Sequence, residues 1–188
     1  INHALEIAQQ AKAAPIVVNV HYKADMLRAH LQNQDVILSD ETGTLLETGG
    51  GLRKALPLLD NSPVLTMNTD AVWHGPNPVT TALDAWAPQM EALLLLVQKA
   101  DVSGHSGQGD FAIGPDRRIN RAPELIYTGV QIIRTDVLSE IGADVFSMNV
   151  AWDIIAQRDG LYGAVYDGQW CDVGQPDSIP LAEAMLHV

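Results

Sequence analysis

The chain has 188 residues, of which 47% are apolar and 18% are charged, and its formal net charge is −12. This composition excludes a disordered protein and fits a single domain that spans residues 1–188. The strong negative charge disfavours nucleic acid and anionic membranes as the main partners.

The cysteine count and the hydropathy of the chain exclude further classes of protein. The only cysteine, Cys171, excludes a disulfide framework within the chain and a cysteine-based zinc site. It is compatible with a reducing cytoplasm, which is the location we expect. The longest apolar run, residues 92–97, is far too short to span a bilayer and predicts a buried strand.

Helical and strand patterns alternate along the chain. Apolar periodicity and helix-ending residues predict helices at 2–13, 23–31, from the glycines at 49–51 onward, at 79–86, at 150–158 and at 176–186. Apolar and β-branched runs predict strands at 16–20, 35–38, 63–68, 91–98, 126–133 and 161–166. The remaining signals predict a flexible loop at 103–110 and a hairpin at 111–119.

This alternation predicts an α/β protein with a layered sheet, parallel in its first half and joined by right-handed crossovers. In such sheets ligands bind at the carboxyl ends of the strands. Glu47, Asp70 and the loop after Tyr166 all fall at or near that edge. The pattern therefore predicts a binding site there.

The stretch at 45–54 reads Leu-Leu-Glu-Thr-Gly-Gly-Gly-Leu-Arg-Lys and opens an amphipathic helix. Glycines at a helix start let a ligand approach bare backbone, and the first N–H groups of a helix have no internal partner. The stretch can therefore hold a nucleobase edge or a phosphate. It matches neither GxxxxGK[ST] nor GxGxxG, and a plain helix-entry turn explains it equally well.

Two carboxylates are candidates for a metal site. Asp70 ends the strand predicted at 63–68, and Asp172 precedes a helix that Pro176 can start. Mg²⁺ prefers oxygen ligands, so the two residues could share one ion that bridges phosphate oxygens. Asp70 alone is explained as readily by a turn, because aspartate favours turns.

Other chemistry-bearing residues give weaker signals. The six histidines show no HxxxH or HExxH spacing, which argues against a zinc hydrolase. Cys171 is interpreted as a packing residue, Trp152 as a core residue, and the glycine of Tyr127-Thr128-Gly129 as a ligand contact or a β-bulge.

Four motifs in chain order resemble the sugar-1-phosphate nucleotidyltransferases, most of all the bacterial N-acetylmuramate-1-phosphate uridylyltransferase and mannose-1-phosphate guanylyltransferase-like group. They are Leu-Glu-Thr-Gly-Gly-Gly at 46–51, Asn-Thr-Asp-Ala-Val-Trp at 68–73, Tyr-Thr-Gly-Val-Gln at 127–131 and Trp-Cys-Asp-Val-Gly-Gln-Pro at 170–176. The resemblance implies a Rossmann-like nucleotide-diphospho-sugar transferase fold, with a mixed, mainly parallel sheet between helices. It also implies a cytoplasmic enzyme that joins a nucleoside triphosphate to a sugar-1-phosphate and releases pyrophosphate.

The resemblance also implies substrates and site residues. UTP and N-acetylmuramate-1-phosphate are the expected pair, in cell-wall sugar recycling; GTP and mannose-1-phosphate are the alternative. The implied nucleotide-binding residues are Glu47, Thr48, Gly49 and Gly50, the implied ligands of a catalytic Mg²⁺ are Asp70 and Asp172, and the implied sugar-binding residues are Gly109, Asp110, Thr128 and Gly129.

One departure from this family lies at the N-terminus. Its members begin with a strand, a glycine-rich loop that carries an arginine, and a Pro-Lys pair, whereas this sequence opens on the helix that normally follows. We therefore expect an N-terminally incomplete domain that is impaired by itself. A non-catalytic nucleotide-sugar sensor remains an alternative, a metal phosphohydrolase ranks last, and a homo-oligomer stays open.

Overall fold

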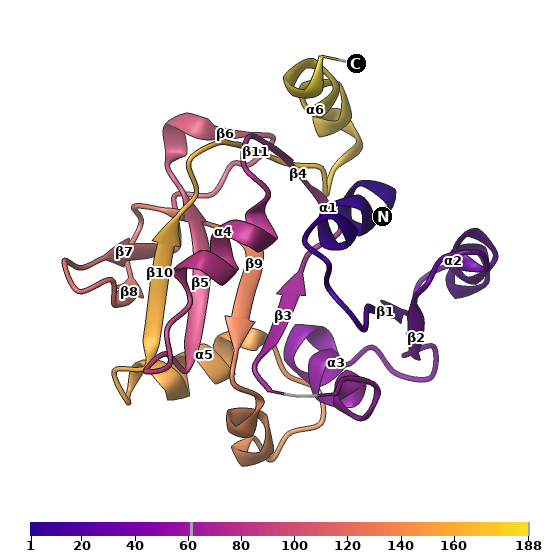
Figure 1. The fold of residues 1–188 in the computed structure, drawn as a ribbon, viewed down its shortest axis with the longest axis horizontal. Helices are drawn as coiled ribbons and strands as arrows, with labels where there is room; N and C mark the ends of the chain where they lie inside the picture. The colour runs from indigo at the N-terminus through magenta and orange to yellow at the C-terminus, as the bar shows by residue number, and fades with distance from the viewer. Residues whose placement is uncertain (61, 188) are drawn as a thin grey trace.

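The computed structural model describes residues 1–60 and 62–187 (Figure 1). The α-helices are α1 (Asn2–Gln10), α2 (Ala24–Leu31), α3 (Glu47–Ala55), α4 (Pro78–Ala85), α5 (Met148–Ala156) and α6 (Ile179–Leu186). The strands are β1 (Val17–Val20), β2 (Ile37–Asp40), β3 (Val64–Met67), β4 (Ala71–His74), β5 (Ala92–Val97), β6 (Val102–Ser103), β7 (Phe111–Ile113), β8 (Ile119–Arg121), β9 (Ile126–Ile133), β10 (Leu161–Val165) and β11 (Gln169–Asp172). Short 3₁₀ turns lie at Leu56–Leu58, Lys99–Asp101, Thr135–Glu140 and Pro176–Ser178.

A four-stranded sheet in the order β10-β5-β9-β3 forms the centre of the molecule. The sheet is mixed, as predicted, but it is not mainly parallel: β5 and β10 run parallel, whereas β9 runs antiparallel to both β3 and β5. The predicted parallel pairing of the first half holds for β1 and β2, which form a separate two-stranded sheet beyond β3 (Figure 1). The predicted hairpin is confirmed as β7 and β8.

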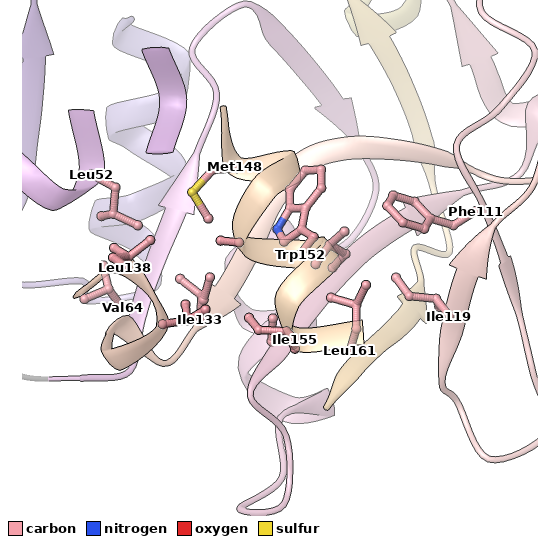
Figure 2. Close-up of a cluster of buried hydrophobic side chains, with 14 of the residues drawn as sticks. Leu52, Val64, Phe111, Ile119, Ile133, Leu138, Met148, Trp152, Ile155 and Leu161 are labelled. Atoms are coloured by element: carbon pink, nitrogen blue, oxygen red, sulfur yellow. The ribbon is translucent and has the colours of Figure 1, made fainter. Parts of the chain in front are cut away.

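The apolar run of β5 forms the core on both faces of this sheet. All six of its side chains are fully buried. Leu94 and Leu96 belong to the cluster around α5, and Leu95 and Val97 to the cluster around α4. A strand covered by helices on both faces needs apolar residues at every position, which explains why this sequence does not alternate. Figure 2 shows the α5 side, where Ile155 lies between Ile133 and Leu161 and Trp152 lies between Met148 and Phe111.

Capping residues in the local sequence set the starts of two helices. Asn77 caps α4, because its side chain accepts hydrogen bonds from the N–H groups of Val79 and Thr80, and Pro78 occupies the first turn. Ser147 caps α5 through the N–H of Asn149, so this helix begins two residues before the predicted position. None of the helices in the described parts of the chain is long and apolar enough to cross a membrane.

A second small sheet, in the order β4-β11-β6, was not predicted from the sequence. Its strands have two to four residues, and β11 runs antiparallel to β4 and parallel to β6. Strands this short carry little periodicity, and their partners are remote in sequence. The sheet matters because it joins the segment after β3 to the segment before α6.

Candidate active site

The ladder between β4 and β11 brings the two predicted metal ligands together. Asp172 is opposite Ala71, and the N–H of Val173 donates to the carbonyl oxygen of Asp70 at 2.8 Å. A Cβ placed on Gly174 would lie 3.0 Å from Asp172 Oδ1 and 3.6 Å from Asp70 Oδ2. Both carboxylates therefore border one small space that the absence of a side chain at residue 174 keeps open.

The donor set around this space fits Mg²⁺. Asp172 Oδ1 accepts the N–H of Gly174 at 2.8 Å, and no donor within the described residues bonds to the carboxylate of Asp70. The described residues contain no group of three His, Cys, Asp or Glu side chains arranged for a metal. Mg²⁺ commonly uses one or two carboxylates and completes its shell with water and substrate phosphates, so two aspartates suffice.

His105 joins this site, and the sequence did not indicate it. Its Nδ1 lies 3.3 Å from Asp172 Oδ2, and its ring meets the ring of Trp170 edge-on at 5.8 Å. Parallel pairing of β6 with β11 puts the loop that carries His105 beside Asp172. His105 belongs to no zinc-binding spacing, and its contact with Asp172 depends on the small sheet that the sequence did not predict.

The start of α3 offers backbone rather than side chains to a ligand. The N–H groups of Gly49 and Gly50 donate to the carbonyl oxygen of Phe146 at 2.9 and 3.1 Å. The two preceding N–H groups, of Glu47 and Thr48, donate to no acceptor within the described residues. Glu47 has a left-handed φ of 63°. Two free N–H groups at a helix start can donate to a carbonyl oxygen of a nucleobase or to an anion.

The glycines of α3 serve close packing. A Cβ on Gly49 would collide with the ring of Phe146, and one on Gly50 would lie 2.5 Å from the carbonyl oxygen of Asp144. The hydroxyl of Thr48 accepts the N–H of Met148 at 2.9 Å. Three of the predicted nucleotide-binding residues thus bind α3 to the segment before α5, and only backbone N–H groups remain for a ligand.

The predicted sugar-binding residues on β9 face the protein interior. Thr128 is fully buried; its hydroxyl donates to the carbonyl oxygen of Leu95 at 2.9 Å, and its own carbonyl oxygen accepts the indole N–H of Trp170 at 3.0 Å. Gly129 has a φ of 87°, and a Cβ there would lie 2.7 Å from Cβ of Asn68. The β5–β9 register shifts at this point, so the bulge interpretation of the glycine is confirmed.

The other two predicted sugar-binding residues, Gly109 and Asp110, attach the end of the loop at 103–110 to β9. The carboxylate of Asp110 accepts the N–H of Tyr127 at 2.9 Å, and its own N–H donates to the carbonyl oxygen of Leu125 at 2.7 Å. Gly109 has a φ of 105°, and a Cβ there would lie 2.8 Å from the backbone N of Glu124. The four residues are connected through β9, and the Thr128 hydroxyl and Asp110 Oδ2 are bonded within the protein.

Two further interpretations can be compared with the structure. Cys171 is fully buried, and burial together with the neighbouring Asp172 raises the pKa of its thiol, as suits a packing residue. Trp152 is a core residue whose indole N–H donates to Gln131 Oε1 at 2.7 Å.

A shallow hollow of about 520 Å³ lies between β2 and the end of α3 and contains none of the predicted site residues.

Comparison of the sequence with known proteins identifies relatives that share most of the length of this chain. No family model matches the chain. The N-acetylmuramate alpha-1-phosphate uridylyltransferase of Caulobacter vibrioides is 33% identical over 201 residues, which cover 99% of this chain and 83% of the relative. The protein of the same name from Neisseria meningitidis is 28% identical and covers 80% of this chain and 67% of the relative.

Solved structures share the fold at lower identity. HddC from Yersinia pseudotuberculosis, complexed with GMP-PN, is 19% identical and superposes with a TM-score of 0.77 over 95% of this chain and 81% of its own. The inositol-1-phosphate CTP transferase from T. maritima is 13% identical, with a TM-score of 0.72 over 98% and 81% of the two chains. At these identities the likeness supports the architecture alone.

Proposed function

This chain belongs to the N-acetylmuramate α-1-phosphate uridylyltransferase family of sugar-1-phosphate nucleotidyltransferases, and we propose that it transfers the uridylyl group of UTP to N-acetylmuramate α-1-phosphate. The products would be UDP-N-acetylmuramate and pyrophosphate. Similarity to the Caulobacter vibrioides relative over 99% of the chain carries the choice of substrates. The juxtaposition of Asp70 and Asp172 supports the reaction class.

The reaction is an in-line displacement at the α-phosphorus of UTP. A phosphate oxygen of the sugar-1-phosphate forms the new bond to this phosphorus, the bond to the bridging oxygen of the β-phosphate breaks, and pyrophosphate leaves with the electron pair. Such a transfer needs no covalent enzyme intermediate, and the protein contributes positioning and charge compensation.

Asp70 and Asp172 would hold Mg²⁺ in this proposal. The ion would neutralise phosphate charge as it builds up, which a chain of net charge −12 otherwise opposes. Asp172 is pre-oriented, because each of its oxygens has a neighbour: the N–H of Gly174 at 2.8 Å and Nδ1 of His105 at 3.3 Å. Asp70 has no such neighbour within the described residues and is free to turn toward a ligand.

The uracil would lie at the start of α3. The free N–H groups of Glu47 and Thr48 point to recognition of base carbonyl oxygens by backbone. The sugar would lie beside the loop at 109–110 and the β9 bulge at 128–129. Since the Thr128 hydroxyl and Asp110 Oδ2 are bonded within the protein, we propose that these residues chiefly shape the sugar site.

Pyrophosphate release tests the proposal. The complete gene product that contains this chain would be assayed with Mg²⁺, crossing UTP and GTP with N-acetylmuramate-1-phosphate, mannose-1-phosphate and glucose-1-phosphate. We expect the highest kcat/KM for UTP with N-acetylmuramate-1-phosphate, and its loss in the Asp70→Asn variant. A preference for GTP with mannose-1-phosphate would overturn the substrate assignment, and binding without turnover would indicate a sensor.

A further inference from the structure

Glu41 is a buried carboxylate that neither the sequence motifs nor the proposed reaction uses. It follows β2 directly, and only 5% of its surface is exposed. No Lys, Arg or His within the described residues forms an ion pair with it. Burial of an unpaired charge is costly unless hydrogen bonds satisfy it, so the bonds that Glu41 accepts deserve a functional explanation.

The hydrogen bonds of Glu41 converge on the start of α3. Its Oε1 accepts a short hydrogen bond from Asn19 Nδ2, and Asn19 also donates to the carbonyl oxygen of Gly51 at 3.1 Å. Its Oε2 accepts the N–H of Leu46 at 3.2 Å. Its own backbone N–H donates to the carbonyl oxygen of Val20 at 2.8 Å. Glu41 therefore connects β1, the turn after β2 and the first turn of α3.

The carboxylate of Glu41 packs closely against the backbone of Gly51. A Cβ on Gly51 would lie 2.7 Å from Glu41 Oε1 and 3.1 Å from Asn19 Nδ2. Gly51, the third glycine of the motif, therefore has a specific packing role. Its lack of a side chain lets the Glu41 carboxylate lie against the helix backbone. The other two glycines admit Phe146 and the carbonyl oxygen of Asp144 from the opposite side.

We infer that Glu41 is a positioning residue for the nucleobase, acting through Leu46 on the free N–H groups of Glu47 and Thr48. Leu46 is the residue immediately before the left-handed Glu47. A non-glycine residue in that conformation is strained by about 1–3 kcal/mol and keeps it only where its surroundings fix the chain. The bond from Leu46 to Glu41 supplies that restraint, so that both donors are aimed before the base arrives.

This inference rests on the proposed function and refines it on the nucleotide side only. A pyrimidine such as uracil presents carbonyl oxygens, which can accept hydrogen bonds from backbone N–H groups. Because Glu41 acts on the base-binding backbone and not on the carboxylate pair, its loss should weaken UTP binding. The affinity for the sugar-1-phosphate and the turnover rate should stay close to wild type.

The test compares Glu41→Ala, Glu41→Gln and the control Asp40→Asn. Asp40 is the adjacent acid; it is exposed, and its carboxylate bonds to Thr42 and Arg28. Its variant removes the same charge away from the start of α3 and keeps the backbone oxygen that accepts from Lys54 near the end of that helix. For Glu41→Ala we expect KM for UTP to rise about tenfold or more, because a hydrogen bond to a charged group is lost. KM for the sugar-1-phosphate and kcat should change less than about twofold. Glu41→Gln keeps an acceptor for Leu46 and should recover most of the UTP affinity.

Calorimetric titration with UTP, together with thermal unfolding of each variant, separates the outcomes. Equal losses in kcat and in both KM values, no rescue by Glu41→Gln and a lower Tm would show a merely structural residue and overturn the inference. A wild type that binds UTP without transfer would overturn the proposed function alone. In that case the UTP affinity of Glu41→Ala relative to Asp40→Asn still decides the role of Glu41.

Discussion

The two ends of the candidate site are built in opposite ways. At the nucleotide end, the side chains of Glu41 and Thr48 bond within the protein, the glycines are packed, and backbone N–H groups remain for the ligand. At the carboxylate end, Asp70 is exposed and makes no side-chain hydrogen bond within the described residues, and Gly174 keeps space beside it. The nucleotide end thus offers backbone N–H groups to a ligand, whereas the carboxylate end offers charged side chains.

This contrast predicts different costs for substitutions at the two ends. A side chain that is bonded and packed contributes to folding, so its replacement should lower stability. A free carboxylate contributes little to folding, and its replacement should lower activity while the fold persists. The four predictions below test this contrast, from the largest expected effect to the smallest.

Asp70→Asn should abolish most activity without loss of stability. Removal of one of two carboxylate ligands removes several kcal/mol of charge stabilisation in the transition state, so we expect kcat to fall about 10³-fold. Pyrophosphate release and thermal unfolding would be measured in parallel. Asp35→Asn, another exposed acid outside the site, is the control. Retention of activity within tenfold would remove Asp70 from the machinery.

Gly49→Ala should show the opposite pattern. The added methyl group collides with the ring of Phe146, and overpacking of this kind costs about 2 kcal/mol. This exceeds the gain of up to ~1 kcal/mol that alanine has over glycine within a helix. Chemical denaturation would measure the loss, with Gly43→Ala as the control, because nothing lies within 4 Å of a Cβ there. Unchanged stability would contradict the packing role of the glycines.

His105→Ala should weaken metal binding about tenfold, because residues that orient a ligating carboxylate typically contribute that much. Titration with Mn²⁺ as a spectroscopic probe would measure the affinity directly, independently of turnover. His105→Asn keeps an N–H donor and should retain most of the affinity. His21→Ala, on an exposed histidine with no side-chain hydrogen bond in the described structure, is the matched control. Equal Mn²⁺ affinity in all variants would show that His105 does not orient Asp172.

Thr128→Val should lower stability by about 1 kcal/mol, because the carbonyl oxygen of Leu95 loses a buried donor. KM for the sugar-1-phosphate should change less than about twofold. Urea denaturation and steady-state kinetics would measure both quantities. A KM increase of tenfold with unchanged stability would instead establish a direct sugar contact, as the family resemblance implies for this residue.

Much of the fold could be predicted from local pattern. The strand at 92–97, the hairpin after Asp110 and the helix begun by the glycines all have strong signals within a few residues. The second strand lies at Ile37–Asp40, two residues later than predicted, because its bounds follow its pairing with β1. The sheet of β4, β11 and β6 could not be predicted, since it depends on pairings between distant short segments.

The site was predictable in position and only partly in role. Asp70 could be found because it ends an apolar strand, and Asp172 because it precedes a helix that Pro176 can start; the structure brings the two together. The direction of the Thr128 side chain could not be predicted, because the bulge at Gly129 interrupts the alternation of side chains between the two faces of β9. Glu41 and His105 belong to no motif, and only tertiary contacts reveal what they bond.

The contact between Trp170 and His105 has an experimental consequence. Trp170 is two residues before Asp172 on β11, is 5% exposed and lies in the cluster around α4, whereas Trp152 lies in the cluster around α5. Indole fluorescence responds to a neighbouring imidazole and to its displacement. The chain has four tryptophans. Replacement of Trp73, Trp86 and Trp152 by phenylalanine would therefore make the emission of Trp170 a label-free optical signal, through which occupancy of the carboxylate end can be followed in real time.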